Sequence, residues 1–209
     1  RLVKQLGTFR EEATEILYRA LVRMIIETVE QTTWFEGGAN GNEPWIKGAY
    51  GSFVRGAIKL SELTKSRCDF ITLNYDISLD YCLSSTGDVD YGFEHVGAKH
   101  ALLKLHGSAN WFNTPIGIVA KSVRVSDIIK YSQKHILEYE HTQGGHRRLK
   151  RIHFSKSTDH KETFIVPPSY SKHFSVPQME FVWRNAAMLL SKADVIVFIG
   201  YSVPPSDLM

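Results

Sequence analysis

The sequence contains only two cysteines, Cys68 and Cys82, among its 209 residues. Two thiols exclude a four-cysteine zinc site and a disulfide framework, and they fit a protein of the reducing cytoplasm. No apolar run approaches the roughly 18 residues that a membrane-spanning helix needs, so we expect no membrane partner. The excess of positive over negative charge is also small, because 25 Lys and Arg against 22 Asp and Glu leave a net charge of +3. So small an excess does not by itself indicate nucleic-acid binding.

The remaining composition is that of an ordinary folded protein. Hydrophobic residues make up 43% and charged residues 22%, which excludes a disordered chain and a fibrous repeat. Against a prior of about 150 residues per domain, the length predicts one large domain or one domain with a small lobe. The sequence opens on Arg1 and ends on Met209 where a helix would begin, so we expect an excerpt of a longer protein.

Helices and strands are predicted to alternate along the chain. Apolar residues at three- and four-residue spacing predict helices at 8–31, 51–64, 127–140 and, behind Ser175 as N-cap, from Pro177 to about Leu190. Short runs of branched apolar residues predict buried strands at 70–73, 101–105, 164–166 and 195–199. Strands covered by helices on both faces indicate an α/β fold with a mostly parallel sheet.

Polar or glycine-containing sequence follows each expected strand. These clusters are Asn74-Tyr75-Asp76, His106-Gly107-Ser108, Pro167-Pro168-Ser169 and Gly200-Tyr201-Ser202. In an open α/β sheet, ligands bind where loops leave the carboxyl ends of the strands. We therefore expect the clusters to meet around one site.

Each cluster has a structural interpretation beside the functional one. Asn74 and Asp76 can hold sugar hydroxyls and stabilise a positive centre, or they can form an Asx turn that ends the strand. His106 suits general-base work, although a histidine at a strand end is more often a structural hydrogen-bonding group. Gly107 allows a ligand to approach the backbone closely. The turn at 200–202 offers amides and a hydroxyl for phosphate or ribose, or is simply a tight turn.

Taken together, the clusters are more specific than their parts. The segments 71–76, 104–111, 165–168 and 193–202 occur in the order found in the sirtuin-like domain. The sequence resembles that family over about residues 68–207, specifically the bacterial branch fused to antiphage defence proteins. The resemblance implies a Rossmann-like, mostly parallel sheet with helices on both faces that binds NAD+.

The resemblance also implies roles for individual residues. Asn74 is similar to the asparagine that positions the nicotinamide ribose and the attacking water. Asp76 is similar to the aspartate near the nicotinamide carboxamide, and His106 to the general base. The implied cofactor-binding residues are Thr72, Gly107, Gly200, Tyr201 and Ser202, the last three on the turn that contacts the adenosine side.

Two family features are missing from the sequence. Deacetylating members carry a four-cysteine zinc ribbon after the histidine, whereas 112–163 contains no cysteine. We expect an insert or small helical lobe there, and no zinc. The glycine-rich loop that cradles pyrophosphate is also not found, since the glycines at 37–41 follow no convincing strand. We expect that strand and loop to precede residue 1, with 1–209 forming a single sirtuin-like domain.

The resemblance implies an NAD+ glycohydrolase that releases nicotinamide and ADP-ribose as the NAD-depleting effector of a bacterial antiphage system. It also implies that a homo-oligomer, regulatory domains or partner proteins of that system hold the activity off at rest. The alternatives are an NAD-dependent protein deacylase or ADP-ribosyltransferase, and a non-catalytic sensor of NAD or ADP-ribose.

Two further features have no assigned role. The basic stretch 144–156 is interpreted as a solvated loop, with nucleic-acid binding through Arg147, Arg148, Lys150 and Arg151 as a weaker hypothesis. Trp34 and Trp45 flank the glycine-containing segment and are candidates for covering a pocket or for an oligomer contact.

Overall fold

The computed structural model describes residues 2–36, 45–46, 49–97, 100–130, 136–156, 162–166 and 176–200. Its helices are α1 (Leu2–Thr32), α2 (Ala49–Thr64), α3 (Ser78–Ser84), α4 (Val125–Lys130) and α5 (Pro177–Lys192). The strands before position 106 are β1 (Phe35–Glu36), β2 (Trp45–Ile46), β3 (Phe70–Thr72) and β4 (Leu102–Lys104). They are followed by β5 (Gly107–Thr114), β6 (Gly117–Ala120), β7 (Leu137–His141), β8 (Arg147–Ile152) and β9 (Thr163–Ile165).

The strands form small sheets of both kinds. β3 and β4 run parallel, with Thr72 opposite Lys104, and a parallel bridge joins Asp90 to Ala101. β5 pairs antiparallel with β6 and β9, and β7 with β8, while β1 and β2 form a short antiparallel pair. The prediction of a mixed α/β protein with parallel pairing is therefore confirmed. The expected strand at 164–166 exists as β9, but it runs antiparallel to its neighbour.

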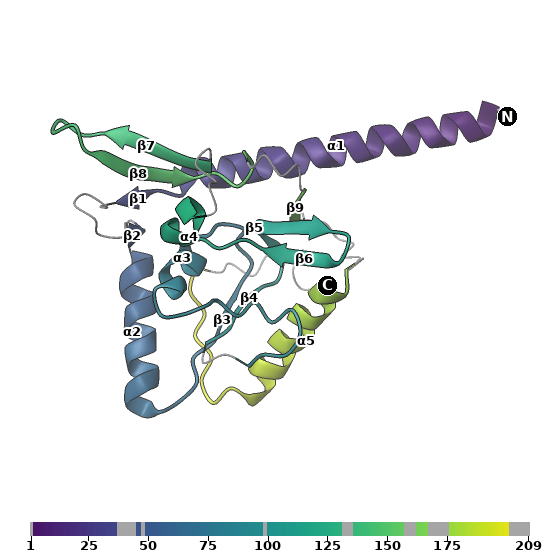
Figure 1. Cartoon of the computed structure of the whole chain (residues 1–209). Helices are drawn as coiled ribbons and strands as arrows, with labels where there is room; N and C mark the ends of the chain where they lie inside the picture. Colours follow the sequence, from purple (N-terminus) through teal and green to yellow (C-terminus); the bar gives the residue numbers. More distant parts are fainter. Residues whose placement is uncertain are drawn as a thin grey trace.

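The parallel pair lies in the core because its residues are apolar on both faces. Leu102 and Leu103 of β4 are fully buried, and Val182 of α5 and Val54 of α2 belong to the same apolar cluster. In Figure 1, α2 and α5 stand on either side of the β3–β4 pair. The helices predicted at 51–64 and from Pro177 are thus confirmed, and each buries one face against this core. The expected N-cap Ser175 was wrong, because the N-cap of α5 is Val176, which makes no side-chain cap hydrogen bond.

Helix α1 confirms the helix predicted at 8–31 and extends beyond the rest of the protein (Figure 1). Val22 and Ile26, one turn apart, are its buried apolar residues, and the Tyr18 hydroxyl donates to the main-chain oxygen of Ile165 at 3.3 Å. No helix in the described ranges is both long and apolar enough to span a membrane.

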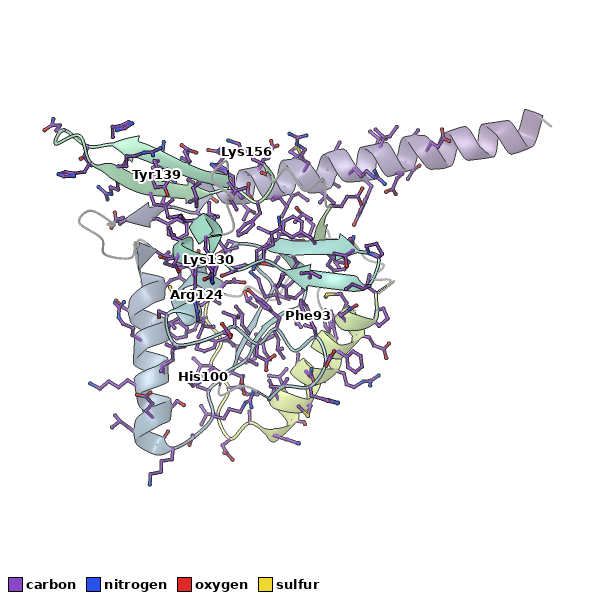
Figure 2. All side chains as sticks on the ribbon, viewed as in Figure 1. Phe93, His100, Arg124, Lys130, Tyr139 and Lys156 are labelled. Carbon is purple, nitrogen blue, oxygen red and sulfur yellow. The ribbon has the colours of Figure 1, made fainter. Side chains whose placement is uncertain are left out.

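The sequence interpretation of 127–156 was wrong in two places. In place of the expected helix at 127–140, α4 ends at Lys130, which Figure 2 labels, and Leu137–His141 is a strand. The basic stretch 144–156 is not a loop throughout, because Arg147–Ile152 within it forms β8. The reason is alternation with period two: Leu149 is buried on β8, whereas its neighbours Arg148 and Lys150 are half-buried on the other face.

The strand expected at 195–199 is also not formed. These five residues belong to no helix or strand and are 48–78% exposed. A strand requires a neighbouring edge that supplies hydrogen bonds. No described strand pairs with 195–199, so its strand-like composition does not lead to a strand in the described part of the chain.

His153 fixes the β7–β8 hairpin to α1. Its Nε2 lies 2.6 Å from Oε2 of Glu138, and its Nδ1 lies 3.5 Å from Oε2 of Glu30. Glu30 also accepts hydrogen bonds from the main-chain N–H of Phe154 and from both donors of Ser155. The hydrogen bond with His153, assisted by Lys150 and Arg151, lowers the pKa of Glu138 to about 2.

Glu138→Gln is expected to make stability less dependent on acid. A carboxyl whose pKa is lowered by folding stabilises the protein at any pH above its ordinary pKa of 4.5. That stabilisation is lost as the pH falls toward the folded-state pKa of about 2. We therefore expect a smaller free energy of unfolding at neutral pH and a flatter decline over that window. Urea melts at stepped pH measure both, with Glu12→Gln on the exposed face of α1 as control. Parallel curves for wild type and Glu138→Gln would contradict the expectation.

Candidate active site

The two parallel strands bring Asn74 and His106 to the same edge of their sheet. Thr72 lies opposite Lys104, and the N–H of Leu105 donates to the main-chain oxygen of Thr72 at 3.0 Å. Asn74 lies two residues after Thr72, and His106 lies two residues after Lys104. Because parallel strands end at a common edge, these positions are neighbours in the fold although 32 residues separate them.

A cavity of about 590 Å³ opens at this edge. Its wall is formed by the end of α1, the start of α2 and the segment after β3: Val29, Thr32, Thr33, Trp34, Ile46, Tyr50, Leu73, Asn74, Tyr75, Asp76 and Ser78. Asn74 and Asp76 therefore share one cavity, and Trp34 lines it, as one of its two suggested roles requires. The size lies within the usual range of about 300–1,000 Å³ for small-molecule sites.

Local hydrogen bonds fix the backbone that carries the two polar side chains. The N–H of Asn74 donates to Oγ1 of Thr72 at 3.1 Å, and the N–H of Ser78 donates to Oδ1 of Asp76 at 2.8 Å. The second bond is the Asx turn considered for this segment. Thr72, expected to bind cofactor, uses its hydroxyl here to shape the turn. The structural and functional interpretations of Asp76 are compatible, because a carboxylate has two oxygens.

Tyr50 completes the polar group and had escaped the sequence analysis. Burial, and after it the nearby charge of Asp76, raises the pKa of the Tyr50 hydroxyl, while the side chain of Asn74 acts in the opposite direction. An aromatic alcohol, an amide and a carboxylate thus meet at one wall of the cavity. No local sequence signal marks Tyr50, because it lies at the start of α2 and meets the segment after β3 only in the folded protein.

His106 lies near this wall but is not part of it. Its side chain is only 7% exposed, and its main-chain oxygen accepts from the N–H of Val166 at 2.8 Å. Its ring centroid lies 6.2 Å from that of Tyr75, which does line the cavity. His106 and Asn74 are therefore neighbours in the fold, but only Asn74 lines this cavity.

Gly107 is glycine for a reason other than the one expected. Its φ is +85°, and a Cβ there would lie 2.4 Å from the main-chain oxygen of Phe164 and 2.9 Å from the Cα of Ile165. The backbone of β9, rather than a ligand, occupies the space that a side chain would take.

The turn at 200–202 is only partly described. Gly200 has a φ of +64° and open space around its Cα. It is exposed and is not among the residues that line the cavity at β3. Tyr201 and Ser202 lie outside the described residues, so their expected cofactor contacts stay predictions.

A buried polar network supports the cavity from the core side. Lys104 forms an ion pair with Asp80 at 2.8 Å, with side chains 1% and 0% exposed, and donates to the main-chain oxygen of Asp76 at 2.5 Å. The Tyr91 hydroxyl donates to Asp80 at 2.8 Å and accepts from Asn110 at 3.0 Å. Burial raises the pKa of Tyr91 well above its ordinary value. Because Lys104 holds the main chain at Asp76, the network positions the cavity wall.

Known proteins offer no relative from which to transfer a role. No protein-family model matches the chain, and neither a curated protein nor a solved structure matches it. In the described part of the chain, no three His, Cys, Asp or Glu side chains gather closely enough to hold a metal ion. Function is therefore inferred from the residues around the cavity and from the sequence motifs.

Proposed function

We propose that this protein is an NAD+ glycohydrolase whose nicotinamide ribose binds in the cavity at the carboxyl end of β3. The observation that carries the proposal is the meeting of Asn74 and Asp76 in a cavity of about 590 Å³ with aromatic walls. The sirtuin-like motif order supports the same substrate. It also favours a Rossmann-like sheet, of which β3 and β4 would be two neighbouring parallel strands.

The wall suits a cationic pyridinium. Trp34, Tyr50 and Tyr75 line the cavity, and aromatic faces attract cations by roughly 0.5–2 kcal/mol depending on desolvation. The carboxylate of Asp76 adds an opposite charge on the same wall. A neutral sugar would gain less binding energy from this wall than the positively charged nicotinamide ring of NAD+.

The proposed reaction requires stabilisation more than acid catalysis. The C1′–N bond breaks with its electron pair moving to the nicotinamide nitrogen, which becomes neutral. A water oxygen then bonds to C1′ and loses a proton, giving ADP-ribose. The oxygen dipoles of Asn74 and Asp76 stabilise the positive charge that develops at C1′. Since nicotinamide is a good leaving group, no strong general acid is needed.

His106 is proposed as the base that accepts the proton from water. Because His106 does not line the cavity, the proton transfer would pass through a bridging water. The absence of His106 from the cavity wall is the one observation that favours the second candidate, a non-catalytic NAD or ADP-ribose sensor. In the antiphage role that the resemblance favours, self-association or further domains would restrain the hydrolase at rest.

Incubation with NAD+ alone separates these functions. We expect steady release of nicotinamide and ADP-ribose, in equal amounts, without any acylated peptide; chromatography measures both products. Release only after an acyl-lysine peptide is added would favour a deacylase. Nicotinamide release with ADP-ribose attached to protein would indicate a transferase. Saturable NAD+ binding without turnover would favour the sensor and contradict the hydrolase.

A further inference from the structure

A second cavity shares one lining residue, Trp34, with the first. It has a volume of about 440 Å³ and is lined by Trp34, Phe35, Glu36, Glu140, Arg148 and Lys150. Trp34 belongs to the walls of both cavities and is 45% exposed. The guanidinium of Arg151 lies 4.2 Å from the centroid of this indole ring. A ligand longer than one cavity would therefore pass the indole of Trp34.

The groups in the second cavity match the three parts of an adenosine diphosphate. An indole face stacks on a nucleobase, as aromatic side chains do in complexes with single-stranded nucleic acids. Carboxylates such as Glu36 and Glu140 accept hydrogen bonds from a ribose diol. Arg148 and Lys150 supply a planar fork and a point charge for two phosphates.

Arg148 has donor capacity that the described residues do not use. Its Nε is buried without a hydrogen-bond partner among them, and the nearest carboxylate oxygen, Oε1 of Glu140, lies 3.7 Å away. That distance allows attraction but exceeds the usual hydrogen-bond length of about 2.7–3.2 Å. A phosphate oxygen is the type of acceptor that a guanidinium binds best.

We propose that the second cavity binds the adenosine diphosphate half of NAD+, with Arg148 and Lys150 on the diphosphate and Trp34 against the base. The assignment rests on the proposed function, which puts the nicotinamide ribose in the first cavity. It differs from the resemblance, which gives the adenosine side to the turn at 200–202.

The alternation of β8 provides a matched control. Arg148 and Lys150 share one face of the strand, whereas the neighbouring Arg147 stacks over the ring of Tyr139 at 4.8 Å, on the hairpin (Figure 2). Arg147 does not line the second cavity. Arg147→Gln therefore removes one positive charge from the same strand without changing a residue of the proposed diphosphate site.

The experiment measures calorimetric binding of ADP-ribose and of adenosine to wild type, Arg148→Gln/Lys150→Gln and Arg147→Gln. We expect the double variant to bind ADP-ribose at least about tenfold more weakly, since it loses the charged donors of both side chains to the diphosphate. Adenosine, which has no phosphate, is expected to lose much less affinity. Arg147→Gln is expected to bind both probes like wild type. Thermal melts verify folding, and the single variant Lys150→Gln replaces the double variant if the latter unfolds.

The outcomes separate this proposal from the hydrolase. ADP-ribose binding that depends on Arg148 and Lys150, in a protein that releases no nicotinamide, supports the diphosphate site and contradicts the enzyme. NAD+ hydrolysis with equal ADP-ribose affinity in the double variant and Arg147→Gln overturns the diphosphate site and leaves the enzyme standing. Failure of wild type to bind ADP-ribose at millimolar concentration also overturns the diphosphate site.

Discussion

Asn74→Ala is expected to slow nicotinamide release from NAD+ by about 100-fold or more, the usual loss when a preorganised polar group is removed from a transition state. The amide lies in the cavity wall together with Tyr50 and Asp76, so its loss removes a dipole from that wall. Because Asn74 is exposed, the free energy of unfolding should change by less than about 0.5 kcal/mol. The measurement is kcat and KM from initial rates of product formation.

Asn113→Ala is the control for this loss. Asn113 is an exposed asparagine on β5 and does not line the cavity, so activity should stay near that of wild type. A decrease confined to kcat would place the contribution of Asn74 in the transition state rather than in substrate binding. An Asn74→Ala enzyme that retains most of its activity would remove Asn74 from the proposed mechanism.

Lys104→Ala is expected to have the largest effect on stability, a loss of about 3–5 kcal/mol in the free energy of unfolding. Its ammonium and the carboxylate of Asp80 are buried together at 2.8 Å, so the substitution leaves a negative charge in the core without its partner. The main-chain oxygen of Asp76 loses a donor as well, which loosens the cavity wall. Urea denaturation measures the loss.

Two companion variants test the cause of this loss. Lys104→Met with Asp80→Asn removes both charges, and it should be more stable than Lys104→Ala because no lone buried charge remains. Arg184→Ala breaks an exposed pair with Glu180, with side chains 65% and 66% exposed, and should cost less than about 1 kcal/mol. Equal losses for Lys104→Ala and Arg184→Ala would contradict the buried pair as a major contributor.

The elements that the sequence predicted correctly are those that local pattern determines. The apolar spacing along α1, α2 and α5 and the branched runs of β3 and β4 specify helix and strand without knowledge of their neighbours. The two elements that were missed depend on partners. Leu137–His141 becomes a strand because β8 pairs with it, and 195–199 is not a strand because no described edge does.

The site was predictable to a similar extent. Asn74 and Asp76 follow a buried strand, which is a local signal for a ligand site in an α/β protein. Tyr50 and the ion pair of Asp80 with Lys104 have no such signal, because tertiary packing brings α2 to the end of β3 and brings β4 to α3. Gly107 shows a different case, because the backbone of β9, which the sequence does not place beside it, excludes any side chain there.

A crystal structure of the Asn74→Ala variant with NAD+ would test the central claim most directly, because slow turnover preserves the substrate. The nicotinamide ribose is predicted to lie in the cavity at the end of β3, with its pyridinium against the aromatic wall and beside the carboxylate of Asp76. NAD+ bound elsewhere on the protein, or an empty cavity at millimolar NAD+, would contradict the assignment of this site.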